Sequence, residues 1–66
     1  MARKRSNAYA MPSWLASGAV FSTPFESGCI VADSPDFDPI TGEFNAYDSD
    51  GVLCGFSLTM PLSPDA

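Results

Sequence analysis

The sequence of 66 residues contains no histidine, and this absence removes several kinds of catalytic and metal site. A Ser–His–Asp triad, a zinc site with imidazole ligands and a histidine proton shuttle are all excluded. The two cysteines, Cys29 and Cys54, are too few for a four-thiolate metal site within one chain. The sequence also offers no nucleophile paired with a base and no oxyanion site. We therefore expect a protein that is not an enzyme, with no catalytic residue, no metal and no cofactor.

Basic residues are scarce, because Arg3, Lys4 and Arg5 are the only three. From residue 6 to residue 66 there are eight acidic residues and no basic one, which gives this body a charge of −8. The body cannot form salt bridges within itself, so its acids must be solvated, cap backbone N–H groups or face a basic partner. Three positive charges make a weak footprint for nucleic acid or for a membrane surface, and we expect neither as a partner.

Long apolar runs are missing as well, and six prolines and five glycines interrupt the chain. Residues 6–25 are uncharged and follow the basic tip, which is the order found in a signal peptide. However, Pro12, Pro24 and scattered serines interrupt this stretch, and it has no dense Leu/Val run. We therefore expect a location in the cytoplasm or in a virus particle and do not expect secretion.

Hydrophobic residues make up 45% of the chain, which is typical of packed rather than disordered proteins. A chain this short forms at most one domain, whose core supplies only about 3–5 kcal/mol. Residues 29–60 carry the clearest pattern, that of a small three-stranded antiparallel meander in a mostly β protein. The expected strands are residues 29–32, 43–47 and 52–60.

Two turns define this meander. Gly42 can adopt a positive φ at the end of the first turn, and the Asp50–Gly51 pair favours a tight hairpin in the second. In the last strand every second residue is apolar, so one face is expected to be buried. That face consists of Val52, Cys54, Phe56, Leu58 and Met60.

The chain before the meander is expected to be an extended N-terminal arm and an aromatic segment over residues 1–28, and residues 61–66 form a C-terminal tail. Pro12 and Gly18 could begin and end at most one short helix near residues 12–17. Residues 19–23 suit a brief extended piece. The apolar face of the meander needs a cover, which either this segment or another protein supplies.

Most of the acidic residues gather in two turns. Residues 48–51 (Asp-Ser-Asp-Gly) resemble the middle of a calcium loop, but Ala46 and Ser57 stand at its two anchoring positions, so we expect no metal there. The second cluster suits solvated turn residues or contacts for a basic partner. Its members are Asp33, Asp36 and Asp38.

Cys29 and Cys54 lie in the first and third expected strands. They are compatible with one disulfide, which would help so small a domain, or with two buried thiols. Because no secretion signal is expected, we favour reduced thiols.

Apolar and basic residues of the first half are the candidate contacts with a partner, because tryptophan and other aromatic residues are common anchors of interfaces. The candidates are Trp14, Leu15, Phe21, Phe25, Arg3, Lys4 and Arg5. The leading hypothesis is a non-enzymatic structural subunit that binds and reinforces a larger protein assembly, namely a viral capsid of many copies, as a cement or decoration protein does. One alternative is an acidic mimic of nucleic acid that inhibits a basic nucleic-acid-binding enzyme. A second alternative is a small secreted module stabilised by a disulfide.

Overall fold

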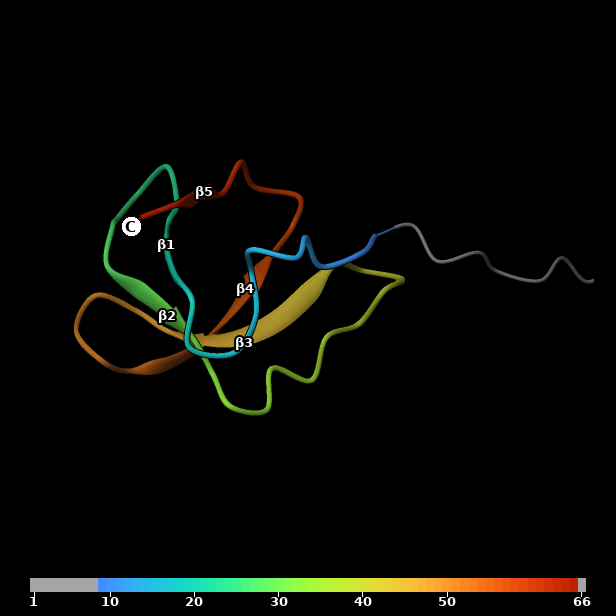
Figure 1. Cartoon of the computed structure of the whole chain (residues 1–66), viewed down its shortest axis with the longest axis horizontal. Coiled ribbons are helices and arrows are strands. Elements are labelled where there is room, and N and C mark those ends of the chain that lie inside the picture. Colours follow the sequence, from blue (N-terminus) through green and yellow to red (C-terminus); the bar gives the residue numbers. More distant parts are fainter. Residues whose placement is uncertain (1–8, 66) are drawn as a thin grey trace, which may run out of the picture.

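Five short strands make up the regular structure of residues 9–65, the part of the chain that the computed structural model describes. The strands are β1 (Val20–Ser22), β2 (Cys29–Val31), β3 (Glu43–Tyr47), β4 (Leu53–Ser57) and β5 (Ser63–Pro64). They form one antiparallel sheet in the order β4-β3-β2-β1-β5 (Figure 1). The expectation of a mostly β protein is confirmed, and the sheet has five strands where three were expected. No helix that could cross a membrane is present among these residues.

The β3–β4 hairpin is the longest ladder of the sheet, with five residue pairs from Glu43↔Ser57 to Tyr47↔Leu53. Its turn contains Gly51 at φ +81°, a conformation that glycine adopts without steric cost. The Gly51 N–H donates to the Asp48 carbonyl oxygen at 2.9 Å and closes the turn. The hairpin expected from the Asp50–Gly51 pair is therefore present.

The last strand of the meander is shorter than the alternation of apolar residues predicts. It ends at Ser57 rather than Met60, because the Met60 N–H donates to the Ser57 carbonyl oxygen at 3.2 Å and turns the chain. Val52 precedes the strand and is 56% exposed, so its expected burial is wrong. Phe56 is the one buried member of the expected face, while Cys54, Leu58 and Met60 are half-buried against the core.

Residues 12–17 form turns instead of a helix. The Leu15 N–H donates to the Pro12 carbonyl oxygen at 2.9 Å, which closes a single turn. The chain then runs beside β2, since the Gly18 N–H donates to the Val31 carbonyl oxygen at 2.9 Å. The chain's own N-terminal segment thus contributes to the cover that the meander needs. Residues 1–8, the greater part of the expected arm, lie outside the described residues.

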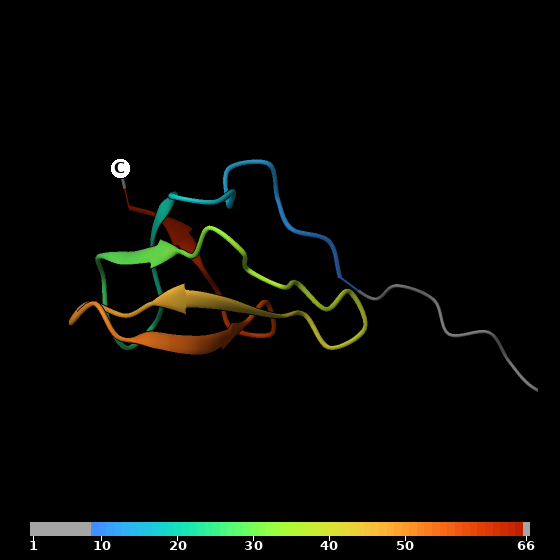
Figure 2. The same cartoon turned by 90° about the horizontal axis from the view of Figure 1, so that it is seen from below.

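The sheet is strongly curved around its core. Residues 58–62 alone connect β4 to β5, although these strands occupy opposite edges of the sheet (Figures 1 and 2). The curvature brings Phe21 of β1 to 5.8 Å from Phe44 of β3 and to 5.4 Å from Phe56 of β4, measured between ring centroids. The inner face, which we define as the face that carries these rings, is therefore filled by the chain itself. The remaining buried members of this core are Leu15, Cys29, Val31 and Ala46.

Candidate interaction surface

The structure places the four apolar candidate contacts in three different environments. Leu15 and Phe21 are 1% and 0% exposed in the chain's own core, which leaves no surface of theirs for a partner. Trp14 is half-buried and packs against that core. Phe25 is 84% exposed in the loop between β1 and β2. The basic candidates at positions 3–5 lie outside the described residues, so their role remains a prediction.

A different set of apolar side chains lies on the outer face of the sheet, opposite the core. Val20 of β1 pairs with Ile30 of β2, Ile30 pairs with Tyr47 of β3, and Tyr47 pairs with Leu53 of β4. Directly opposed side chains on one face lie about 5 Å apart, so the four residues form a continuous line across four strands. We call this set the apolar row.

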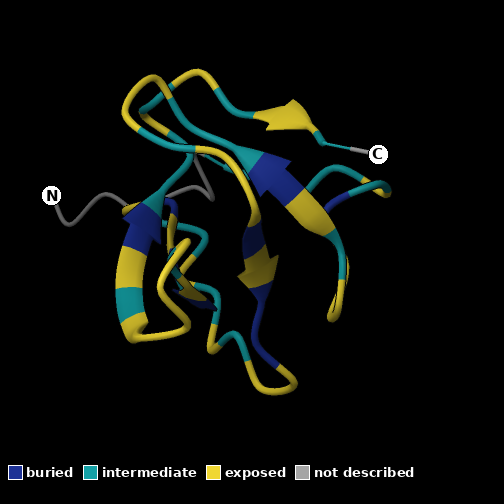
Figure 3. Cartoon of the chain, turned by 90° about the vertical axis from the view of Figure 1, so that its left-hand side faces the viewer, coloured by how far each residue is buried: buried dark blue, intermediate teal, exposed yellow. Residues whose placement is uncertain are grey.

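Each member of the apolar row is substantially exposed, from 40% for Val20 and Tyr47 to 56% for Leu53. The pattern follows from the two-residue period of strands, since the neighbours of these residues in the sequence point to the inner face. Figure 3 shows buried and exposed stretches succeeding each other along the strands. Contiguous exposed apolar surface of this kind marks sites of interaction more often than scattered single residues do.

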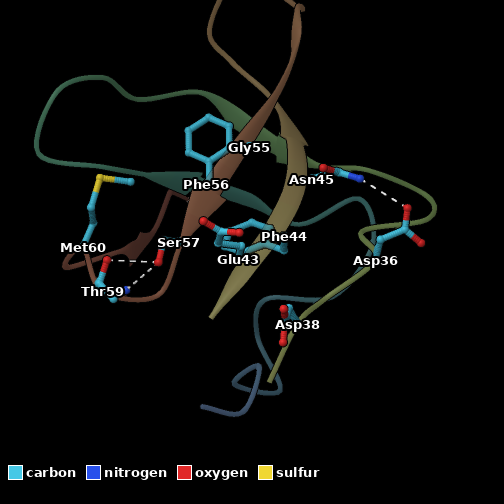
Figure 4. A pocket seen from close by; sticks show the side chains of 10 residues that line it. All are labelled: Asp36, Asp38, Glu43, Phe44, Asn45, Gly55, Phe56, Ser57, Thr59 and Met60. Carbon is cyan, nitrogen blue, oxygen red and sulfur yellow. Dashed lines mark hydrogen bonds between the residues drawn. The ribbon is translucent and has the colours of Figure 1, made fainter. Parts of the chain in front are cut away.

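An acidic hollow adjoins the apolar row. It is an open depression of about 610 Å³ whose lining includes the carboxylates of Asp36, Asp38 and Glu43. Figure 4 shows Asp36 and Asp38 on one side of the hollow and Thr59 and Met60 on the other. Of the acidic cluster noted in the sequence, Asp33 is not part of the lining.

Glycine helps to make this hollow. A Cβ atom at Gly55 of β4 would have no neighbouring atom within 4 Å, so the missing side chain leaves open space. Beside it, the Asn45 side-chain amide donates to an Asp36 carboxylate oxygen at 3.3 Å. This bond ties the loop that follows β2 to the outer face of β3.

Part of the hollow shares the outer face of the β3–β4 hairpin with the row, although its lining also includes Phe44 and Phe56 of the inner face. The pair Tyr47–Leu53 belongs to the row, and the pairs Asn45–Gly55 and Glu43–Ser57 belong to the hollow. Successive pairs on one face are about 7 Å apart along the strand, so Asn45–Gly55 lies one step and Glu43–Ser57 two steps, about 14 Å, from Tyr47–Leu53. Asp36 is bound to Asn45, so its carboxylate lies nearer the row along β3 than that of Glu43 does.

Acidic residues also flank the opposite end of the sheet. A Glu26 carboxylate oxygen accepts hydrogen bonds from the Ser49 N–H at 3.0 Å and the Ser49 hydroxyl at 2.6 Å. These bonds join the β1–β2 loop to the β3–β4 turn. Asp48 and Asp50 belong to the same turn, so this end carries three carboxylates close to the end of the row.

Asp48 organises the β3–β4 turn with its carboxylate. One oxygen accepts the N–H groups of Asp50 and Val52, both at 2.9 Å, and the other accepts the Cys54 thiol at 3.6 Å. The hydrogen bond from Val52 is the largest of the causes that hold the pKa of Asp48 below its ordinary value. The folded hairpin thus binds the ionised form of Asp48 in preference to the protonated form.

We expect Asp48→Asn to reduce stability at about pH 6 and to have a smaller effect at about pH 3. Because the pKa of Asp48 is lower in the folded state, its contribution is complete above the unfolded value near 4 and disappears as the pH falls through the folded value. Urea midpoints followed by Trp14 fluorescence at the two pH values measure the difference. Asp33→Asn, in another loop, is the control, and an equal loss for Asp48→Asn at both pH values would contradict this role.

Both cysteines are free thiols, Cys29 buried and Cys54 half-buried. Burial is the largest cause that raises the pKa of each thiol, and the carboxylates of Glu26 and Asp48 add to it. Both thiols are therefore protonated at neutral pH, and the fold is built without a bridge between them. Among the described residues, no group of three or more His, Cys, Asp and Glu side chains could hold a metal ion.

No protein-family model matches the chain, and no curated protein or solved structure shows significant similarity to it. What the fold defines is a small all-β antiparallel protein. The outer face of this sheet, with its exposed apolar residues and nearby carboxylates, is the feature of the fold that bears on function.

Proposed function

We propose that this chain is a non-enzymatic structural subunit that binds and reinforces a larger protein assembly. The observation that carries the proposal is the apolar row, four aligned side chains that stay 40–56% exposed while the core is completed on the other face. A domain whose core supplies only about 3–5 kcal/mol gains from burying such a surface against a partner.

A virus capsid is the assembly that we propose. One copy of this chain offers a small contact surface, and an assembly of many identical subunits compensates for weak single contacts by repetition. The acidic body of the chain agrees with this proposal, since it favours binding to capsid subunits whose exposed surface is basic.

The test is the mass of the native complex that contains the chain. We expect a complex many times heavier than the chain's own 7.0 kDa, with a fixed ratio of this chain to the subunits of the assembly. Native mass spectrometry of the purified complex measures both quantities. Recovery of the chain only as a free monomer would contradict the proposal.

The acidic hollow supports a second candidate function, that of a nucleic-acid mimic bound to a basic enzyme. Asp36, Asp38 and Glu43 gather there and could stand in for phosphates. This candidate predicts a one-to-one complex whose affinity falls steeply with salt, with Asp36→Asn and Asp38→Asn as the most harmful changes. The same native mass measurement separates the two candidates, because one predicts a multi-copy assembly and the other a single partner.

A further inference from the structure

We infer that the apolar row is the docking surface for a protein partner whose contact region has an apolar centre and a rim of lysine or arginine. The inference rests on the proposed function and specifies the contact surface and the partner's chemistry. Its first basis is geometry, because the row crosses β1, β2, β3 and β4 without interruption. Interfaces of proteins combine such an apolar centre with a polar rim.

The charges around the row define the rim of the partner. At one side lie Asp36, Asp38 and Glu43 of the hollow, and at the other end lie Glu26 and the β3–β4 turn with its two aspartates. No basic residue occurs after Arg5, so nothing in the body neutralises these carboxylates. A partner that covers the row must therefore carry positive charges at the rim of its contact surface. Without them, the carboxylates around the row would have no opposite charge across the interface.

A second copy of this chain does not meet that requirement. Two bodies that each carry −8 would place like charges against one another around the row. Like-charge juxtaposition across an interface is costly and selects against such pairing.

The chain's own N-terminus does not meet it either. Residues 1–8 bring three basic residues, but Met1 is their single large apolar side chain. They can supply a basic rim but cannot cover four apolar side chains. The occupant that fits both the row and its rim is therefore a separate protein.

Three short synthetic peptides test the chemistry of the partner. In each, valine and isoleucine alternate with a second residue, which is lysine in the first peptide, serine in the second and glutamate in the third. Amide chemical shifts of the full, isotopically labelled chain are followed during titration up to about 1 mM peptide, the range of weak binding. We expect the lysine peptide to shift the amide signals of residues in the row and its rim. It should bind at least about tenfold more tightly than the serine peptide, and its affinity should fall with added salt. The glutamate peptide should leave the row unchanged.

Variants of the chain test the surface. Ile30→Thr and Leu53→Thr keep residues suited to strands and should each weaken binding of the lysine peptide about tenfold, as expected for apolar anchors of an interface. Phe25→Thr is the matched control, since Phe25 is more exposed than any member of the row but lies in the β1–β2 loop. The affinity of the Phe25→Thr chain for the lysine peptide should equal that of the unchanged chain.

The inference would be overturned by no binding of the lysine peptide, by equal binding of the glutamate peptide, by shifts confined to residues away from the row, or by a dimer of the chain formed through the row. A large gain in affinity after deletion of residues 2–8 would identify the chain's own N-terminus as the occupant and would also overturn it. The native mass measurement is independent of these outcomes. A heavy native complex combined with an unresponsive row would leave the proposed function standing and reject this surface alone.

Discussion

Phe21→Ala should leave most of the chain unfolded in buffer at room temperature. Phe21 is 0% exposed and touches both other rings of the core, with centroids 5.8 Å from Phe44 and 5.4 Å from Phe56. Truncating a buried phenylalanine costs about 3–5 kcal/mol, and each aromatic pair adds about 0.5–1.5 kcal/mol. The whole core of a domain this small supplies about 3–5 kcal/mol, so the loss equals or exceeds the stability available.

Urea unfolding followed by Trp14 fluorescence measures this effect, because Trp14 is the single tryptophan and packs against the core. Phe21→Leu provides a folded intermediate, in which most of the apolar volume remains and the midpoint falls without loss of the cooperative transition. Phe25→Ala is the matched control at a residue that is 84% exposed, and its free energy of unfolding should stay within about 0.5 kcal/mol of the unchanged chain. A cooperative transition at an unchanged midpoint for Phe21→Ala would show that the rings do not meet as described.

The β3–β4 hairpin shows what the sequence could predict. Its turn depends on an Asp–Gly pair and its strands on a two-residue period, and both signals are local. The apolar alternation predicts a longer β4 than the structure has, because it continues through Leu58 and Met60 while the backbone already turns after Ser57. Those two side chains still pack against the core, so their apolar character is explained without a strand.

The pairing of strands β1 and β5 could not be predicted from local sequence patterns. Residues 19–23 suggested an extended piece, but nothing in them indicates that Phe21 pairs with Cys29 on one side and with Pro64 on the other. β5 has two residues, one of them proline, which suits an edge strand because proline lacks a backbone donor. Such a strand exists only because the curved sheet brings the tail beside β1, so a tertiary contact creates it.

The apolar row could not be predicted from the sequence for a similar reason. Each strand contributes a single member, and Val20 and Leu53 stand at its two ends although they are far apart in the chain. The alignment depends on the register of three strand pairs, and a shift by one residue would turn each side chain to the core. Leu15 and Phe21 show the converse, because both are buried in a core of the chain itself that depends on the same strand pairing.

Gly42→Ala should destabilise the chain by about 2–4 kcal/mol, clearly more than the same change at Gly51. Gly42 and Gly51 have nearly the same φ, +80° and +81°, so an alanine meets the same backbone strain of about 1–2 kcal/mol at each. The difference lies in the surroundings. A Cβ at Gly42 would stand 3.0 Å from Cγ of Tyr9, whereas a Cβ at Gly51 meets nothing within 4 Å.

The ring of Tyr9 is therefore the expected source of the extra loss. The backbone of Tyr9 is fixed by its N–H, which donates to the Pro39 carbonyl oxygen at 2.9 Å, so the ring can yield to the new Cβ only by rotating about its side-chain torsions. Urea midpoints for Gly42→Ala, Tyr9→Ala and the double variant form a cycle that isolates this term. In the Tyr9→Ala background, Gly42→Ala should cost no more than Gly51→Ala does in the unchanged chain. If the excess loss of stability at Gly42 persists in the Tyr9→Ala background, the ring of Tyr9 is not its cause. The cause would then lie in the turn that the Gly42 N–H closes by donating to the Asp38 carbonyl oxygen.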